Sequence, residues 1–196
     1  KYNKDALFSK NNMSVFFPAG AFYDDFNLNF DVKNDRIYVH DDTVPVHSSF
    51  TITIEDDKYP ENLKDKVYIG RFTGKNSNYN STSRKGAVYT AKSRILGQFG
   101  LVVDTIKPTI SIAKPIEGKW ISDVKKIQFT INDGMSGIKS YNGYLNGKWI
   151  LFEYDNKTKK ITHDFNDGVV AEGANDLKIE VVDNVGNSAI FETRFF

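Results

Sequence analysis

The chain has 196 residues, 40% hydrophobic and 14% aromatic, which is enough apolar material for one large core or two small ones. Its 26 Lys and Arg residues almost balance 25 Asp and Glu residues, giving a formal net charge of +1, and this balance excludes an electrostatic nucleic-acid binder. The absence of cysteine excludes disulfides and thiolate metal sites. The sequence shows neither a signal peptide nor a membrane span. It opens at Lys1 without an initiator Met, which indicates a mature or trimmed piece of a longer protein.

The first half of the chain has the periodicity of β-structure. Alternating apolar and polar residues predict strands over 26–32 and 50–55, and an apolar run predicts a buried strand over 99–103. Residues 60–66 begin with Pro and could form one helical turn. The Gly-, Asn- and Ser-rich residues 73–85 are expected to form a mobile, exposed loop. Since no long stretch carries a sustained helical stripe, we expect an all-β protein.

A domain boundary is predicted near residues 104–109. Pro108 cannot donate a ladder hydrogen bond and favours an extended Lys107, so a short, stiff connector is expected there. The predicted units are a β-sandwich over 1–104 and an immunoglobulin-like β-sandwich over 105–196. The second unit has seven candidate strands, at 109–113, 125–131, 137–144, 148–154, 160–165, 177–183 and 189–195.

The dipeptide Asn146-Gly147 separates two of these strands. Both residues tolerate positive φ, and the pair is the preferred sequence for a type I′ turn. We therefore expect a tight hairpin that joins 141–145 to 148–152.

Several strings in the second half resemble one family. SGIKSY at 136–141, NGKWIL at 146–151 and EYD at 153–155 are similar to the C-terminal region of lysostaphin-type zinc endopeptidases of Gram-negative bacteria. VVDNVGN at 181–187 looks like the closing hairpin of that region, and FPAGAFYD at 17–24 resembles its middle segment. The Pro-Ala-Gly stretch also resembles β-sandwich modules that precede autoproteolytic or death domains in larger receptors. These matching motifs are structural and not catalytic.

The zinc site of the peptidase family is missing from this sequence. That site needs His and Asp at short spacing together with a His-x-His pair, whereas this chain has only His40, His47 and His163, with no such pair. A zinc hydrolase requires three protein ligands that converge on the metal. No Gly-x-Ser-x-Gly elbow occurs either. The sequence therefore predicts no catalytic residue and no cofactor, and it places any catalysis outside the chain.

Two polar groups remain as candidate metal ligands. The first consists of His40, Asp42 and His47, which can also be read as a polar loop between two strands. The second offers oxygen atoms of the kind that calcium prefers. Its members are Asp133, Ser136, Asp183, Asn184 and Asn187. The alternative is that these Asp and Asn residues occupy turns because their side chains bond the nearby backbone. The EF-hand pattern is absent.

Aromatic residues of the second half could stack on sugar rings. The candidates for a ligand-binding role are Trp120, Tyr141, Tyr144 and Tyr154. Trp149 is expected in the core.

The resemblance implies an exported protein, periplasmic or extracellular, that is an accessory or scaffolding module of a peptidoglycan-cleaving metallopeptidase. Its expected partner is a peptidase domain located upstream in the same protein. Two alternatives come from other classes. One is a module that binds glycan or peptidoglycan, and the other is a module that docks an envelope protein through an exposed sheet edge. No nucleic-acid partner and no membrane span are expected.

Overall fold

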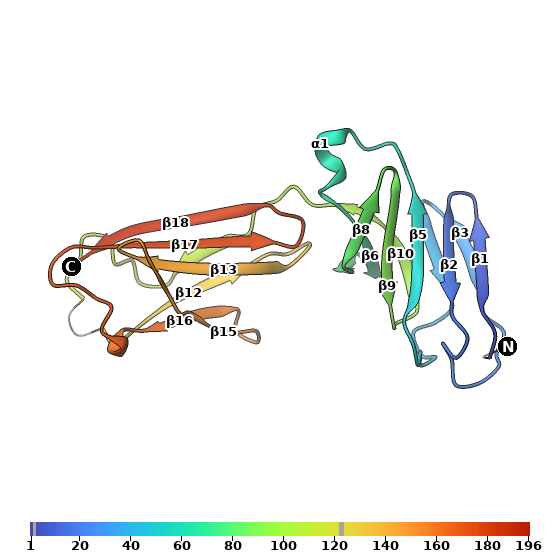
Figure 1. The fold of residues 1–196 in the computed structure, drawn as a ribbon, viewed down its shortest axis with the longest axis horizontal. Coiled ribbons are helices and arrows are strands. Elements are labelled where there is room, and N and C mark those ends of the chain that lie inside the picture. The colour runs from blue at the N-terminus through green and yellow to red at the C-terminus, as the bar shows by residue number, and fades with distance from the viewer. Residues whose placement is uncertain (2, 122–123) are drawn as a thin grey trace. The chain divides into compact units, whose positions relative to one another are not determined.

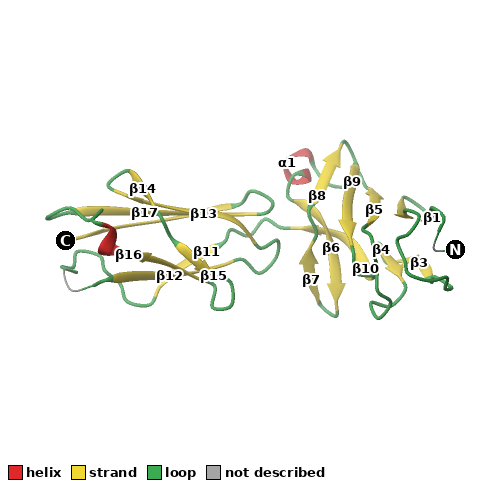
Figure 2. Cartoon of the chain, turned by 60° about the horizontal axis from the view of Figure 1, so that its bottom comes forward, coloured by secondary structure: helices red, strands yellow, loops and turns green. Residues whose placement is uncertain are grey.

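The computed structural model describes residues 1, 3–121 and 124–196 of the chain. By its internal contacts the chain divides into two compact units, Lys1–Asp104 and Thr105–Phe196. Both units consist almost wholly of antiparallel strands, as Figures 1 and 2 show. The predicted fold class, all-β with two tandem β-sandwiches, is confirmed. None of the described helices is long and apolar enough to cross a membrane.

The first unit contains two five-stranded sheets. One has the order β1-β2-β5-β9-β8 and the other the order β3-β4-β10-β6-β7. The strands of the first sheet are β1 (Ala6–Lys10), β2 (Met13–Phe17), β5 (Phe50–Glu55), β8 (Thr82–Lys85) and β9 (Val88–Ser93). Those of the second are β3 (Phe30–Lys33), β4 (Arg36–Val39), β6 (Val67–Thr73), β7 (Asn76–Tyr79) and β10 (Gly97–Val103).

Alternating residues of these strands turn inward and fill the first core. In β5 the residues Phe50, Ile52 and Ile54 are fully buried, while the threonines between them are only partly covered. The Phe50 ring lies 4.8 Å from the Phe17 ring and 5.9 Å from the Phe99 ring, as measured between centroids. Within this core an aromatic cluster therefore joins the two sheets.

Two predictions for the first unit need correction. The strand predicted over 26–32 is shorter and begins at Phe30, because Phe26 packs against the nearby Phe22 ring at 4.7 Å and not in a ladder. The segment predicted as a mobile loop, 73–85, contains β7 and β8. Asn80, which lies between these strands, and Thr82, the first residue of β8, both bond the main chain of Ile69 in β6: the Ile69 amide donates to Thr82 Oγ1, and Asn80 Nδ2 donates to the Ile69 carbonyl. The predicted helical turn is confirmed as α1 (Glu61–Lys64).

The second unit contains two four-stranded sheets, ordered β11-β12-β16-β15 and β14-β13-β17-β18. The first comprises β11 (Thr109–Ile112), β12 (Lys126–Asn132), β15 (Glu153–Asp155) and β16 (Lys160–Asp164). The second comprises β13 (Ile138–Leu145), β14 (Lys148–Ile150), β17 (Asn175–Asp183) and β18 (Ser188–Phe195). In chain order these are the A-B-E-D and C′-C-F-G arrangements of an immunoglobulin domain, so this unit is immunoglobulin-like.

The hairpin predicted at Asn146-Gly147 is confirmed. Asn146 and Gly147 have φ angles of 50° and 76°, as a type I′ turn requires, and Tyr144 pairs with Trp149 across the two strands.

The single strand predicted over 148–154 is wrong. The chain leaves β14 after Ile150 and enters β15, in the opposite sheet, at Glu153. Between them Phe152 turns into the core, where it is 3% exposed. Its ring fills the space beside Gly143, because a Cβ added there would lie 2.3 Å from a ring carbon. The segment that crosses from β14 to β15 in the opposite sheet therefore depends on a glycine in β13.

Candidate functional site

The outer face of the sheet β14-β13-β17-β18 carries aromatic and polar side chains, of which Trp149 is exposed and Tyr144 and Lys178 are half-buried. Trp149, Tyr144, Lys178 and Glu192 pair in register, one from each strand, and so form a row across the sheet. Asn142, Glu180 and Ile190 form the next row. We call this surface the outer face.

Trp149 is 58% exposed on the outer face, so its predicted place in the core is wrong. The tight turn sets the register of β13 and β14, and this register puts Trp149 beside Tyr144 and places Ile150, which is buried, opposite Gly143. The indole Nε1 of Trp149 donates a hydrogen bond to Asn142 Oδ1 at 3.3 Å, which orients the ring.

A concave region of about 900 Å³ lies over the same face, next to Tyr144. Four of its charged side chains form two ion pairs. Arg194 binds Asp176 through two hydrogen bonds of 2.6 and 2.8 Å, and Lys178 Nζ lies 2.6 Å from Glu180 Oε1. The neighbouring carboxylate of Glu180 raises the pKa of Lys178, and that of Asp176 raises the pKa of Arg194, so both cations remain charged at neutral pH.

The sequence identified only Tyr144 of this face as a ligand-binding candidate. The missed residues have a recognisable signal, because charged side chains occupy every second position of β17 (Asp176, Lys178, Glu180) and of β18 (Glu192, Arg194). This alternation indicates a solvent-facing sheet surface. Sequence alone does not indicate which aromatic residues share that surface.

The other aromatic candidates lie elsewhere in the second unit. Trp120 is 75% exposed and its ring is 5.4 Å from that of Phe196. Tyr141 and Tyr154 are partly buried against the core, with their rings 5.6 Å apart. The four predicted aromatic candidates therefore do not form one surface.

Asp133 and Asp183 come together at one end of the second unit, with carboxylate oxygens within 4.8 Å of each other. Asp133 Oδ1 accepts hydrogen bonds from the amides of Met135 and Gly137, at 2.9 and 2.7 Å. These bonds support the alternative that Asp133 occupies a turn because its carboxylate bonds the backbone of its own loop.

Asp183, which is fully buried, has the same role in the turn after β17. Its Oδ1 accepts from the amides of Val185 and Asn187, at 3.0 and 2.7 Å, and its Oδ2 accepts from Asn187 Nδ2 at 2.7 Å. Asn184 Nδ2 in turn donates to the carbonyls of Ser136 and Gly137, so the two loops are bonded to each other. Two carboxylates at this separation could hold a hard cation such as calcium, which stays a prediction.

The first metal candidate, His40 with Asp42 and His47, does not assemble. Among the described residues these three do not form a group with mutually close ligand atoms. His40 Nδ1 accepts from the Asn29 amide at 3.4 Å, Asp42 lies 3.6 Å from Arg71 Nη1, and His47 Nδ1 is 3.2 Å from the Tyr23 hydroxyl. Each side chain is engaged with a different neighbour.

The third histidine is a core residue. His163 is 2% exposed, its Nδ1 donates to the Leu151 carbonyl at 2.8 Å, and its ring lies between those of Phe152 and Phe165. Nε2 lies 3.6 Å from Asp167 Oδ2. His163 thus holds the crossing segment against β16.

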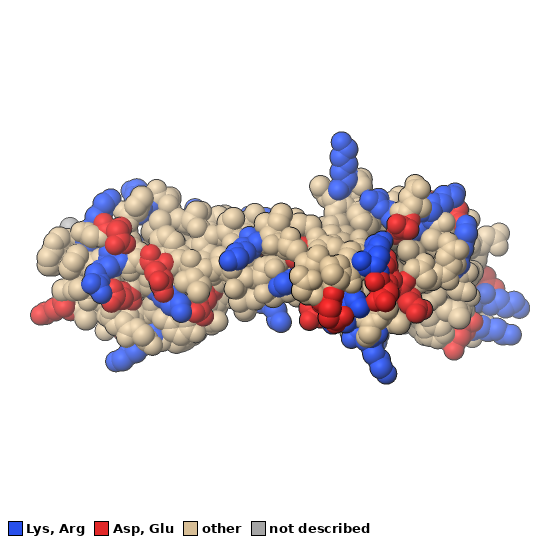
Figure 3. Space-filling view, turned by 90° about the horizontal axis from the view of Figure 1, so that it is seen from above, with Lys and Arg blue, Asp and Glu red and all other residues tan. Residues whose placement is uncertain are grey.

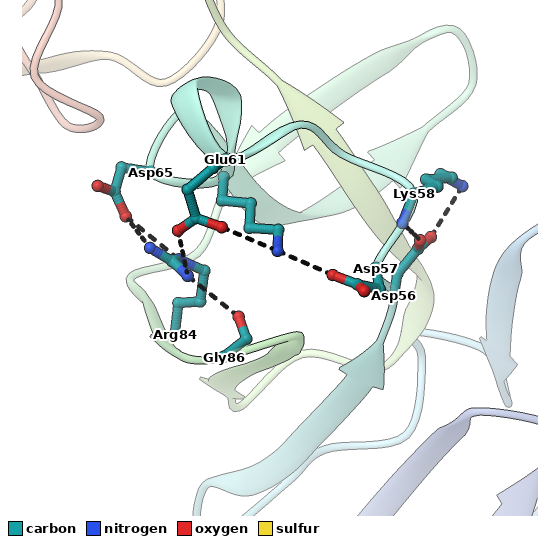
Figure 4. Close-up of polar contacts among 8 residues, drawn as sticks. Asp56, Asp57, Lys58, Glu61, Asp65, Arg84 and Gly86 are labelled. Carbon is teal, nitrogen blue, oxygen red and sulfur yellow. Dashed lines mark hydrogen bonds and ion pairs between the residues drawn. The ribbon is translucent and has the colours of Figure 1, made fainter.

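In the first unit, the polar side chains around α1 form an ion-pair network (Figure 4). Arg84 of β8 binds Asp65 at 2.6 Å and approaches Glu61 at 3.8 Å, while Lys64 lies between Glu61 and Asp57, 3.0 and 2.8 Å away. These pairs fasten α1 to the β8–β9 hairpin. Because the acids are largely exposed, each pair contributes little to stability. Charges of both signs also intermingle over the surface seen in Figure 3.

Comparisons with known proteins give one family. The model of the Zu5-like domain matches residues 1–104, slightly more than half of the chain. No curated protein sequence matches this chain. Among solved structures, one described as tandem Ig repeats of Dlar is similar over 76% of this chain and 87% of that chain, with 7% identity and a TM-score of 0.29. The immunoglobulin-like character of the second unit rests on its strand order.

Proposed function

The chain belongs to the Zu5-like domain family, and we propose that it is a non-catalytic accessory module of an exported cell-wall metallopeptidase. In this proposal the chain positions or regulates a catalytic domain located elsewhere in the same protein. That domain would cleave peptide bonds of peptidoglycan with a zinc-bound water, and the residues of this chain would take no part in the chemistry.

One observation carries the non-catalytic part of the proposal: the side chains best suited to chemistry are engaged in holding loops. Asp133 and Asp183 accept backbone amides, and His163 donates to a carbonyl inside the core. His40 and His47 are bonded to a backbone amide and a tyrosine hydroxyl. Groups tied in this way are suited to building rigid loops, whereas a hydrolase needs a base or a metal facing its substrate.

The cell-wall part of the proposal is supported by the resemblance of residues 136–141, 146–151 and 181–187 to the C-terminal region of lysostaphin-type peptidases. An exported location, periplasmic or extracellular, follows from the same resemblance.

A cleavage assay tests the proposal. The purified chain is incubated with peptidoglycan sacculi and zinc, and released fragments are separated by chromatography. We expect no fragments above the level of a heat-denatured control. Release that survives further purification and stops on addition of a chelator would show that the chain is itself an enzyme.

The peptidase partner has a separate test. The reading frame that encodes Lys1 is followed upstream, where we expect a His-x-His pair and a His-x-x-x-Asp spacing. A frame that encodes a different kind of domain would remove the peptidase from the proposal.

A further inference from the structure

We propose that the outer face of the sheet β14-β13-β17-β18 is a binding surface for uncharged oligosaccharides. Trp149 and Tyr144 would stack on sugar rings, and the paired charged side chains beside them would bond the hydroxyl groups. This inference goes beyond the accessory role and does not depend on it, because sugar binding by this face requires no peptidase.

The aromatic half of the surface is already oriented. Trp149 and Tyr144 are directly opposite each other on adjacent strands, a spacing at which side chains are about 5 Å apart at Cβ. The indole is 58% exposed and is held by its bond to Asn142. The negative face of an aromatic ring attracts polarised C–H groups, and those are the groups that a sugar ring presents. A ring fixed before binding loses little conformational entropy when the ligand arrives.

The polar half offers donors and acceptors side by side. Lys178 and Glu180 form one pair, and Arg194 and Asp176 form another. Each pair leaves further N–H groups and further oxygen lone pairs for a ligand. A sugar hydroxyl both donates and accepts, so two neighbouring hydroxyls can bond an acid and a base together.

The size of the surface fits a short chain of sugars. The row from Trp149 to Glu192 crosses four strands, which is three strand spacings or about 14 Å. The concave region of about 900 Å³ covers the part of this row formed by Tyr144, Lys178 and Glu192, and Trp149 lies outside its lining.

Charge decides which ligands are favoured. Four carboxylates (Glu117, Asp176, Glu180 and Glu192) and two cations (Lys178 and Arg194) line the concave region, which leaves a net charge of −2. A negative surface disfavours nucleic acids and acidic polysaccharides. The centre of a protein-binding surface is depleted in charged residues, whereas the centre of this face carries Lys178 and Glu180, so a protein partner is also disfavoured.

The test is a titration of the full chain with two uncharged probes, the tetramers of N-acetylglucosamine and of glucose, and with one acidic probe, the tetramer of galacturonic acid. The chain has two tryptophans, so a Trp120→Phe variant leaves Trp149 as the only one. We expect its emission to change and saturate with at least one uncharged tetramer, and to change at least threefold less with the acid at equal concentration.

Variants assign the binding to this face. Trp149→Ala and Tyr144→Ala should each weaken binding at least tenfold by calorimetry. Trp120→Ala, which removes a more exposed indole outside the face, should change the affinity less than twofold. Thermal unfolding of each variant verifies that the second unit is folded, and Tyr144→Phe, which keeps the ring, should retain binding within about threefold.

Three outcomes would overturn the proposal. The first is an emission of Trp149 that responds to neither uncharged tetramer. The second is binding that is lost equally in the Trp120→Ala variant. The third is an effect of Trp149→Ala on cross-linking to an envelope protein with no effect on sugars, which would make the face a protein-docking surface.

Discussion

The two units place their aromatic residues differently. In the first unit Phe17, Phe50 and Phe99 are buried in one cluster between the sheets. In the second unit, by contrast, both tryptophans of the chain, Trp120 and Trp149, are exposed. The second core also contains buried phenylalanines, Phe129, Phe152 and Phe195, so the difference between the units lies in the two exposed indoles.

This contrast indicates where binding chemistry is to be sought. The polar side chains around α1 in the first unit pair with one another (Figure 4), and the two tyrosines that interact with their lysines and arginine are Tyr59 and Tyr89, of which Tyr89 is fully buried. The outer face of the second unit combines the exposed indole of Trp149 and the half-buried ring of Tyr144 with paired charges. Mutations in the first unit should therefore affect stability first, and mutations on the outer face should affect binding first.

The largest expected effect is the loss of the Phe50 ring. Phe50→Ala removes a fully buried side chain that contacts Phe17 and Phe99, which should cost about 3–5 kcal/mol and lower the melting temperature of the first unit by more than about 10 °C. Circular dichroism follows both units, while tryptophan fluorescence follows the second alone. An equal drop in the fluorescence transition would contradict the assignment of separate cores.

A second experiment tests the crossing segment of the second unit. Gly143→Ala places a Cβ 2.3 Å from the buried Phe152 ring, and this overpacking should cost about 1–3 kcal/mol. The matched control is Gly134→Ala, where a Cβ meets nothing within 4 Å, so we expect no loss. In the Gly143→Ala variant the unfolding transition followed by tryptophan fluorescence should shift to lower temperature. Equal stability of the two variants, measured by urea unfolding, would mean that Phe152 does not occupy this space.

The third prediction concerns the loop carboxylates. Asp183→Ala leaves the amides of Val185 and Asn187 without their acceptor in a buried turn, which should destabilise the second unit by about 1–3 kcal/mol. Asp155 makes the same kind of turn at the surface, where its carboxylate accepts from the Lys157 amide and Thr158 Oγ1. Asp155→Ala should cost less, because water can replace the carboxylate. An equal cost at the two positions would argue against the importance of burial.

The smallest expected effect is a pH dependence in the first unit. Bonds from Lys10, and then from Lys33, hold the pKa of Asp31 well below its usual range. Since the folded pKa is below the unfolded value of about 3.9, the stabilisation is present above pH 4 and is lost as the pH falls through the folded pKa. Asp31→Asn should lower the melting temperature slightly at pH 7 and less at pH 2, where part of the stabilisation is already lost, and added salt should reduce the difference. A difference that grows on acidification would contradict this account.

Local patterns predicted those parts of the fold that local chemistry controls. The alternation in 50–55 is sufficient to identify β5, and the positive φ angles that Asn146 and Gly147 tolerate are sufficient to identify the hairpin. The prediction of a single strand over 148–154 failed because this one apolar stretch supplies two strands, β14 and β15, of opposite sheets. The crossing is set by Phe152 packing beside Gly143, a contact that the sequence pattern does not contain.

The candidate site was only partly predictable for the same reason. Alternation indicates that Tyr144 and Trp149 can share a face, but which face is turned to solvent depends on the pairing of β13 with β17. The turn role of Asp133 and Asp183 was one of two interpretations, and their hydrogen bonds support it directly. The approach of the two carboxylates depends on the immunoglobulin-like topology, which brings distant loops to one end.

We propose a combined role, in which the chain is a non-catalytic module that binds uncharged sugars of the cell wall through the outer face of its second unit. Sedimentation with purified sacculi in the presence of zinc tests it most directly. We predict that the wild-type chain and the Trp120→Ala variant enter the pellet, that Trp149→Ala stays in the supernatant, and that no peptidoglycan fragments are released. Wild-type chain that stays in the supernatant, or fragments whose release stops with a chelator, would contradict the claim.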